Sequence, residues 1–427
     1  MAKKKTTRRR NTAATAAVAP SSKKNAELRV AILGTGFMGR AHSNAWRSAG
    51  TFFDLPRPLV MHSACGSDLA ESRRFAGQWG WASGTDDWKS LVRDPDVDLV
   101  DVCTPNHLHA EMSIAALEAG KHAACEKPMA GTLDDARLMR DAAKKAARKG
   151  VRSFVWFNYR RVPAIAYAHR LVKSGRLGRI FHVRASYLQD WGHPDTPLVW
   201  RFQSKKAGSG AHGDLNAHII DMARFLTGDE VSEVVGSVQE TFVKQRELVD
   251  EAGSAIKGTI KKGSKNAGRG RKRTGKSTVD DALLFLARFK GGAIGSFEAT
   301  RVATGNLNRN TIEINGELGS FKFDFERMNE LQWWDHTLEP GLRGWSRIMC
   351  TEAGEHPYVH AYWPAAHGLG YEHAFVSQAA DIDRMLAGGD PEVPMPDFVD
   401  AFETQRVLEA AVISARDRTP VPMSQVT

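Results

Sequence analysis

Asp214 and His218 are the first candidates for proton chemistry. They follow a glycine-rich segment, 208–213, at the start of a predicted helix. Residues i and i+4 share one face of an α-helix, so the carboxylate is placed to orient the imidazole. A histidine with the usual pKa near 6.5 suits the role of general base toward an alcohol. A helix-capping aspartate beside an unrelated histidine is the alternative.

A glycine-rich turn, Gly34-Thr35-Gly36-Phe37-Met38-Gly39, matches the GxGxxG pattern of dinucleotide-binding proteins. It follows an apolar run and opens a helical pattern, as that fingerprint requires. Gly34 permits a tight turn, Gly36 lets backbone approach a pyrophosphate, and Gly39 lets the helix pack on the strand. The helix N-terminus then faces the phosphates, which predicts a site for NAD or NADP.

Lys127 lies in the segment Glu126-Lys127-Pro128, directly after a short predicted strand at 123–125. Open α/β sheets bind their ligands at the carboxyl ends of the strands. A lysine there can donate a hydrogen bond to a substrate hydroxyl or carbonyl beside the nicotinamide.

The second predicted strand lacks the acidic residue that usually binds the ribose 2′-hydroxyl of NAD. Gly66 stands at that position, followed by Ser67. Without a carboxylate a 2′-phosphate is not repelled, and Ser67 with Arg73 or Arg74 is placed to approach it. Alternatively, Asp68 reaches the ribose, which suits NAD. The choice between NAD and NADP stays open.

The elements that must position these residues fall into two groups. Residues 28–152 alternate strand-like and helical patterns, which predicts βαβ units and a mostly parallel sheet, an α/β Rossmann domain. Residues 153–427 contain runs of consecutive strands with intervening helices, which predicts an α+β domain with a largely antiparallel sheet. The expected strands there are 180–188, 234–242, 282–289, 293–300, 310–314 and 319–325, and the expected helices are 163–174, 218–226, 371–387 and 399–415.

The net charge of +10 comes from two segments. Residues 1–24 and 253–276 carry seventeen Lys and Arg and no acidic residue, so 42 basic residues face 49 acidic ones elsewhere. Both segments are polar and rich in small residues, which predicts a disordered tail, 1–27, and a flexible insert at about 250–278. We expect no specific nucleic-acid partner for the acidic body.

The four cysteines are widely spaced and form no CxxC pair, which indicates a reducing compartment. No apolar run approaches the roughly 18 residues that span a bilayer. The histidines show no ligand spacing with carboxylates, so we expect no metal site. These features together predict a cytoplasmic protein.

The chain resembles the Gfo/Idh/MocA family, the glucose–fructose oxidoreductase and inositol dehydrogenase group, from about residue 28 to 422. The most specific motifs are Thr104–Glu111, Ala119–His122 and Cys125–Pro128. Phe157–Arg161, Tyr187–Trp191, Trp200–Gln203 and Glu298–Arg301 are similar to the sugar dehydrogenases within it. The glycine at position 66 and the basic insert depart from the family pattern.

The resemblance implies an NAD(P)-dependent enzyme that moves hydride to or from a ring hydroxyl of a sugar, anhydrosugar, glycoside or cyclitol. Catalytic roles fall to Lys127, Asp214 and His218. Cofactor contacts fall to Gly34, Gly36, Phe37, Met38, Gly39, Gly66, Ser67, Thr104, Pro105, Asn106, His109, Glu126, Lys127 and Pro128.

Six further residues are expected to contact the substrate. Trp191 and Tyr159 suit stacking on an apolar sugar face. Hydrogen bonds to hydroxyls are assigned to Asn158, Arg160, Gln189 and Asp190. Alternatives are a keto-sugar reductase, an enzyme that cleaves glycosides after oxidising them, or a non-catalytic NAD(P)-binding sensor. A homodimer or homotetramer formed through the second-domain sheet is also expected.

Overall fold

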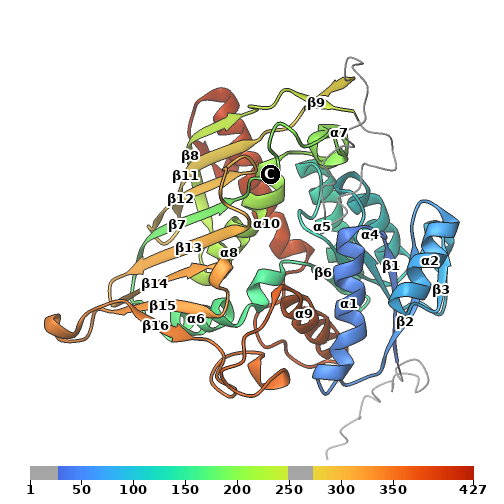
Figure 1. Ribbon diagram of the computed structural model, residues 1–427, viewed down its shortest axis with the longest axis horizontal. Coiled ribbons are helices and arrows are strands. Elements are labelled where there is room, and N and C mark those ends of the chain that lie inside the picture. The colour runs from blue at the N-terminus through green and yellow to red at the C-terminus, as the bar shows by residue number, and fades with distance from the viewer. Residues whose placement is uncertain (1–26, 249–272) are drawn as a thin grey trace, which may run out of the picture.

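The computed structural model describes residues 27–248 and 273–427. They form a six-stranded and a nine-stranded sheet with their helices, which lie side by side in Figure 1, and a small two-stranded sheet. The basic segment 1–26 and residues 249–272 of the insert lie outside the described residues. The predicted disordered tail and most of the predicted flexible insert therefore lie outside the described residues.

The first sheet has six parallel strands in the order β3-β2-β1-β4-β5-β6, which confirms the Rossmann-type α/β prediction. The strand order reverses between β1 and β4, where folds of this kind bind ligands. The strands are β1 (Leu28–Leu33), β2 (Leu59–Cys65), β3 (Ser83–Thr85), β4 (Leu99–Val102), β5 (His122–Cys125) and β6 (Ser153–Val155). The helices are α1 (Phe37–Phe52), α2 (Leu69–Trp79), α3 (Trp88–Arg93), α4 (His109–Glu118) and α5 (Leu133–Ala147).

The first sheet reaches past the boundary expected at residue 152, because β6 pairs with β5. The backbone N–H of Val155 also donates to the carbonyl of Pro396, 2.8 Å away, near the other end of the chain. Helix α9 (Tyr371–Leu386) packs beside α1 in Figure 1. Arg57 holds it there through a 2.7 Å ion pair with buried Asp383. The C-terminal part of the chain thus helps to complete the first domain.

The second sheet has nine strands in the order β16-β15-β14-β13-β7-β12-β11-β8-β17. Only β7 and β12 pair in parallel, so the prediction of a largely antiparallel sheet is confirmed. Its strands are β7 (Ile180–Leu188), β8 (Val231–Glu240), β11 (Ala282–Phe289), β12 (Ile294–Thr300), β13 (Arg309–Gly316), β14 (Gly319–Asp324), β15 (Glu330–Asp335), β16 (Ser346–Met349) and β17 (Val421–Pro422). The other helices are α6 (Pro163–Lys173), α7 (Ser204–Ala207), α8 (Ala217–Thr227) and α10 (Phe398–Asp417).

The end of the basic insert is not the flexible segment that we expected up to residue 278. Strand β10 (Thr274–Lys276) pairs antiparallel with β9 (Gln245–Glu247) in a two-stranded sheet that the sequence analysis missed. Arg246 on β9 is buried, lies 3.6 Å from the ring centroid of Phe202 and pairs with Asp281 at 3.2 Å. This buried arginine holds the two-stranded sheet against the second domain, because a charged group in the interior must keep its partners.

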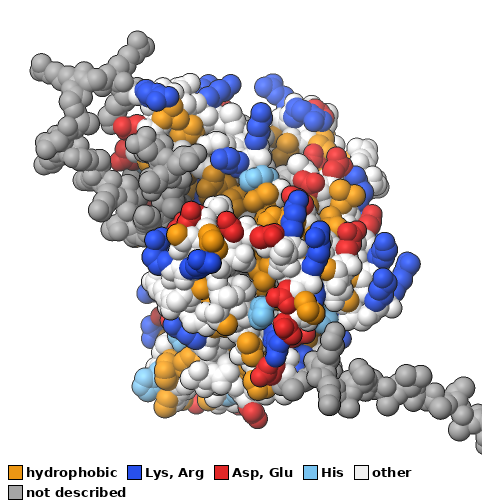
Figure 2. Space-filling view, turned by 90° about the vertical axis from the view of Figure 1, so that its right-hand side faces the viewer, with side chains coloured by type: hydrophobic (Ala, Val, Ile, Leu, Met, Phe, Trp, Pro, Cys, Tyr) orange, Lys and Arg blue, Asp and Glu red, His pale blue; other side chains and the backbone are white. Residues whose placement is uncertain are grey.

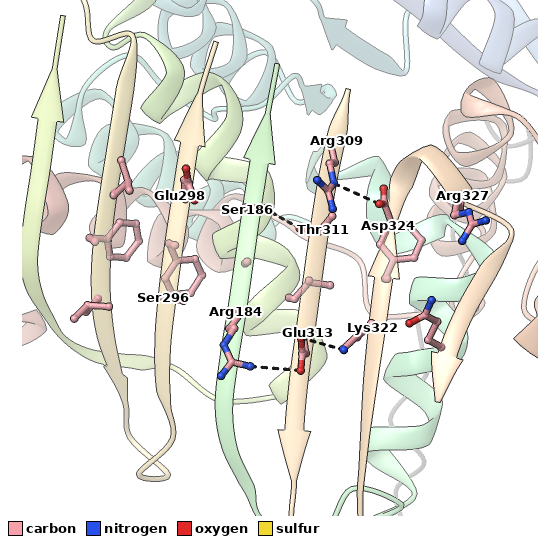
Figure 3. A pocket seen from close by; sticks show the side chains of 18 of the residues that line it. Arg184, Ser186, Ser296, Glu298, Arg309, Thr311, Glu313, Lys322, Asp324 and Arg327 are labelled. Atoms are coloured by element: carbon pink, nitrogen blue, oxygen red, sulfur yellow. Dashed lines mark hydrogen bonds and ion pairs between the residues drawn. The ribbon is translucent and has the colours of Figure 1, made fainter. Parts of the chain in front are cut away.

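One face of the second sheet is covered by helices α8 and α10, and the other is open (Figure 1). Side chains alternate accordingly along β11, where Leu283 and Phe285 are buried while Leu284 and Leu286 are exposed. Figure 3 shows the open face, a hollow of about 770 Å³ in which Arg184 and Lys322 both pair with Glu313. We call this the outer face.

No helix of the described chain is both long and apolar enough to cross a membrane. Figure 2 shows the side that the first domain occupies in Figure 1, where Lys and Arg side chains are interspersed with Asp and Glu. Neither sign dominates that side.

Candidate active site

A cavity of about 1430 Å³ lies between the domains, at the carboxyl ends of β1, β2, β4 and β5. The first domain forms the half that is suited to a dinucleotide. The second domain forms most of the remaining wall, which includes Tyr187, Trp191, His218 and Asn308. The junction of the halves holds Lys127 and Asp214.

The turn between β1 and α1 has the geometry that the GxGxxG pattern predicts. Gly34 adopts φ +114°, and a Cβ there would lie 2.6 Å from the carbonyl oxygen of Cys103. A Cβ at Gly39 would lie 2.1 Å from the carbonyl oxygen of Gly34, so the helix and strand could not approach as they do. Gly36 instead lines the cavity and has open space where a side chain would project.

Helix α1 begins at Phe37 with no side-chain cap and no acidic residue in its first turn. Its first N–H groups are therefore available to an anion at the cavity wall, which Phe37 and Met38 also line. The uncapped helix and the open glycine turn fit the pyrophosphate of a nicotinamide dinucleotide.

The end of β2 places Gly66 and Ser67 in the cavity wall, as expected of cofactor-binding residues. Asp68 does not line the cavity. It caps α2 by accepting the N–H of Glu71 at 2.7 Å, so the alternative in which it reaches the ribose is not supported. Asp86, which directly follows β3, lines the same end of the cavity. The sequence analysis missed it because β3 is only three residues long.

The loop after β4 contributes Thr104, Pro105, Asn106 and His109 to the wall. The imidazole of His109 connects this loop to the next one, with Nε2 2.9 Å from the carbonyl of Thr104 and Nδ1 3.0 Å from that of Pro128. The side-chain amide of Asn106 donates to the carbonyl of Ala207 at 2.9 Å, across the domain boundary. Asn106 therefore helps to hold the second domain against this loop.

Lys127 crosses the same boundary with its side chain. Its Nζ lies 3.0 Å from Oδ1 of Asp214 and 2.9 Å from the carbonyl oxygen of Asp214. Arg301 approaches the same carboxylate at 3.7 Å. Burial alone would raise the pKa of Asp214, but Lys127, Arg301 and Arg201 hold it well below its usual range. Asp214 is thus ionised and fixes the position of the Lys127 ammonium.

The predicted pairing of Asp214 with His218 differs from what the structure contains. Residues His212–Asn216 form a π-helical turn, so the i, i+4 relation of an α-helix does not hold at Asp214. The carboxylate is bonded to Lys127 instead. The Nδ1 atom of His218 is buried and has no hydrogen-bond partner within the described chain.

His218 is enclosed by aromatic rings in the cavity wall, 4.5 Å from the ring centroid of Tyr159 and 5.8 Å from that of Tyr187. Burial, together with the Lys127 charge, lowers its pKa well below the usual 6.5, against the opposing effect of Asp214. The expectation that His218 titrates near pH 6.5 is therefore corrected. The imidazole is therefore neutral at neutral pH, with one ring nitrogen that carries no proton.

Glu126 supports the lysine from behind. Its Oε2 accepts the backbone N–H of Lys127 at 3.1 Å, and its Oε1 lies 3.0 Å from Nε2 of His42. The other nitrogen of His42 lies 3.0 Å from Asp101, which also accepts the indole N–H groups of Trp46 and Trp156. Burial alone would lower the pKa of His42, but Asp101 and Glu126 raise it to about 9.

His42, Asp101 and Cys103 stand close enough together to offer ligand atoms to a metal ion. The carboxylate of Asp101 is already engaged by His42 and the two indoles. These hydrogen bonds explain why the three side chains lie together, because they form a network within the protein that supports the site.

The expected substrate residues divide into two sets. Asn158, Tyr159, Gln189 and Trp191 line the cavity. Arg160 does not, because its guanidinium is buried and pairs with Asp221 and Asp400 at 2.8 and 2.6 Å. Asp190 also lies outside the wall and accepts the N–H of Gly305 at 3.2 Å.

Several wall residues were absent from the predicted site, among them Tyr187, Arg201, Arg301 and Asn308. Tyr187, Arg201 and Arg301 lie within segments that carried the family resemblance, and that resemblance was the signal that could have identified them. Asn308 had no signal, because it lies in the loop before β13.

Comparison with known proteins agrees with this geometry. Residues 28–154 match the oxidoreductase family with an NAD-binding Rossmann fold, and residues 165–322 match the GFO/IDH/MocA C-terminal domain. Levoglucosan dehydrogenase of Pseudarthrobacter phenanthrenivorans is 40% identical over 94% of this chain and 99% of its own. Myo-inositol 2-dehydrogenase of Thermotoga maritima is 27% identical over 74% of this chain and 81% of its own.

Two solved structures are also similar. An oxidoreductase domain protein from Kribbella flavida superposes with a TM-score of 0.85 at 48% identity, covering 93% of this chain and 99% of that one. Levoglucosan dehydrogenase in complex with NADH and levoglucosan gives a TM-score of 0.82 at 38% identity, with the same coverage. The resemblance that the motifs indicated is confirmed over nearly the whole chain.

The His42 network makes stability depend on pH. The pKa of His42 is higher in the folded protein than in the unfolded chain. Protonated His42 therefore contributes its full share to the free energy of unfolding below about pH 6.5, and this contribution is lost as pH rises through about 9. We expect the wild type to lose up to about 3 kcal/mol across that window, and His42→Gln to show a smaller slope. Chemical denaturation at each pH measures this, with exposed His336→Gln as the control. Equal slopes in wild type and His42→Gln would contradict the assignment.

Proposed function

The chain belongs to the Gfo/Idh/MocA family of oxidoreductases, and we propose that it is an NAD-dependent dehydrogenase that oxidises a ring hydroxyl of a sugar, anhydrosugar, glycoside or cyclitol. The observation that carries this is the meeting of Lys127, Asp214 and His218 at the junction of the cofactor and substrate halves of one cavity. A binding-only sensor has no need of an ammonium and a neutral imidazole held together there.

We favour NAD over NADP. Gly66 supplies no carboxylate, but Asp86 lines the same end of the cavity and would repel a 2′-phosphate. Arg73 and Arg74, which were considered as phosphate ligands, do not line the cavity, and Arg74 approaches Glu71 at 3.9 Å. The similarity to a dehydrogenase solved with NADH agrees with this choice.

The residues divide the reaction between them. His218, neutral because burial lowers its pKa, takes the proton of the substrate hydroxyl. Lys127, held by Asp214, donates to the same oxygen and stabilises the negative charge that develops on it. When bound, the nicotinamide supplies the redox chemistry by accepting a hydride from the substrate carbon. Trp191 and Tyr159 offer flat apolar surface to the ring.

The alternatives differ in direction or outcome. A keto-sugar reductase would use the same three residues in reverse, with His218 returning the proton. An enzyme that cleaves glycosides after oxidation would release an aglycone. Product analysis after incubation with NAD and with NADH separates these reactions from simple dehydrogenation.

We also propose that the outer face contacts a second copy of the chain. Val238, Leu284, Leu286 and Ile294 form an exposed apolar group on three adjacent strands, with Leu284 directly opposite Val238. Beside it lie basic and acidic side chains in pairs, as Figure 3 shows. A surface that carries both signs and an apolar patch can complement itself across a two-fold axis. The location that we propose is the cytoplasm, because the four cysteines are buried, unpaired thiols.

Lys127→Met tests the oxyanion donor. The variant keeps the apolar stem but loses the ammonium, so kcat should fall by roughly 100-fold or more while NADH affinity stays within a few-fold. Steady-state turnover and NADH fluorescence titration measure the two effects. Exposed Lys144→Met is the matched control and should retain wild-type turnover. Near-normal kcat in Lys127→Met would remove this residue from the mechanism.

His218→Asn tests the base. Since burial and Lys127 lower the pKa of His218, the rise of kcat/KM with pH that reports its deprotonation should lie below pH 6.5 in the wild type. The variant should lose this rise and turn over roughly 100-fold or more slowly. Initial rates of both proteins, measured between pH 5 and 8 at constant buffer concentration, test this expectation. A pH limb that persists in His218→Asn identifies another base.

Leu286→Arg tests the outer face. A charge at this position, 55% exposed within the apolar group of the outer face, should convert the wild-type oligomer into a smaller species without loss of the fold. Light scattering with size-exclusion chromatography measures the mass, and circular dichroism checks the fold. Leu138→Arg, on the first domain and 59% exposed, should leave the mass unchanged. A monomeric wild type at micromolar concentration contradicts the proposed interface.

A further inference from the structure

A chain of hydrogen bonds runs along the substrate half of the cavity and converges on Asn308. The indole Nε1 of Trp191 donates to Oε1 of Gln189 at 2.6 Å, and Nε2 of Gln189 donates to Oδ1 of Asn308 at 2.7 Å. From the other side, the hydroxyl of Tyr187 donates to the same Oδ1 at 2.7 Å. The hydroxyl of Tyr159 lies 2.7 Å from that of Tyr187.

The direction of this chain is set at Trp191. An indole N–H can only donate, so the amide of Gln189 must turn its oxygen toward Trp191. The NH2 group of Gln189 then faces Asn308, which must accept this hydrogen bond with its Oδ1. If both amides were reversed, the indole N–H and the Gln189 NH2 group would be two donors 2.6 Å apart.

The tyrosines agree with the same direction. The single proton of the Tyr187 hydroxyl goes to Asn308, so Tyr187 accepts from Tyr159. Burial raises the pKa of both phenols, which keeps both protons in place. Neither tyrosine has a spare proton to offer to a substrate.

Asn308 is left with one unused group. Its Oδ1 accepts two hydrogen bonds, whereas its Nδ2 has no partner among the residues that the structure describes, although the residue lines the cavity. Two further wall residues carry buried donors without a partner in the same described set, Nε of Arg301 and Nδ2 of Asn158. The amide oxygen of Gln189, in contrast, is occupied.

We propose that Asn308 is a specificity-determining residue that donates a hydrogen bond from its NH2 group to an acceptor-only oxygen of the substrate. This inference rests on the proposed function and names its substrate class. Ring and bridging acetal oxygens of anhydrosugars and glycosides accept but cannot donate. Cyclitols carry only hydroxyls on their ring, and each brings a proton that needs an acceptor, whereas the Asn308 NH2 group can only donate.

The physical basis of the selection is the cost of unpaired polar groups. A buried donor or hydroxyl proton without a partner loses its hydration and gains nothing in return. Gln189 and Trp191 are positioning residues in this account, because they act on the substrate only through the direction of the Asn308 amide. Asn308 itself touches the substrate.

Asn308→Asp tests the proposal directly. The carboxylate keeps an oxygen for Tyr187 and Gln189 and replaces the NH2 group by a second oxygen. With levoglucosan, methyl β-D-glucoside and myo-inositol as probes, the wild type should prefer an acetal-containing probe over myo-inositol by at least tenfold in kcat/KM. The variant should lose this preference by roughly ten- to a hundred-fold, mainly through KM.

Two further variants keep the result interpretable. Trp191→Phe removes the indole N–H that sets the direction, so Gln189 can turn and the preference should weaken while Asn308 is intact. Asn306→Asp is the matched control, because this residue lies on the same loop, outside the cavity wall, and bonds Ala303. It should keep the wild-type preference, and unfolding midpoints check that all variants fold.

Calorimetric titration of the NADH complex with the same probes reads the preference without turnover. An active wild type that binds and turns over myo-inositol as well as the acetal-containing probes overturns the inference, as does an unchanged preference in Asn308→Asp. Absence of turnover with every probe counts against the proposed function instead, and the binding preference still decides the role of Asn308.

Discussion

The ion pair between Lys127 and Asp214 is the interaction on which the rest of the site depends. It joins the carboxyl end of β5 to the π-helical turn of the second domain, at 3.0 Å. Neither partner can act alone, because the ammonium without the carboxylate would lack a fixed position and the buried carboxylate without the ammonium would lack compensation. The cofactor and substrate halves of the cavity meet where this pair is formed.

A second, fully buried network supports that pair from within the first domain. His42 stands between Asp101 and Glu126, and Glu126 in turn holds the backbone of Lys127. Two indole N–H groups complete the hydrogen bonds of Asp101. Such a cluster is tolerated in the interior because every charge has a close partner.

In the substrate half of the cavity, neutral side chains likewise fix one another through hydrogen bonds. A donor-only indole sets the direction of two amides, and the two tyrosines close the chain from the other side. Their mutual hydrogen bonds occupy the Asn308 oxygen and leave its NH2 group without a partner in the described chain. A buried donor without a partner selects a ligand by what it leaves unpaired as much as by what it binds.

The sequence by itself determined the features that depend on neighbours along the chain. Hydrophobic periodicity placed β7 and β11 at their observed bounds, and the glycine pattern predicted the tight turn at Gly34–Gly39, because strand, helix and turn preferences are local. The location of Lys127 at the cavity followed from the rule that parallel strands present their carboxyl ends to ligands.

Only the tertiary structure decided which charges meet. Asp214 bonds Lys127, distant in sequence, and the Nδ1 atom of His218 has no hydrogen-bond partner within the described chain. Arg160 is withdrawn into an ion pair with Asp221, and Asn308 enters the wall from a loop without any motif. A buried charge takes the partner that packing brings within hydrogen-bond distance, and that choice depends on how the two domains fit together, which no local pattern encodes.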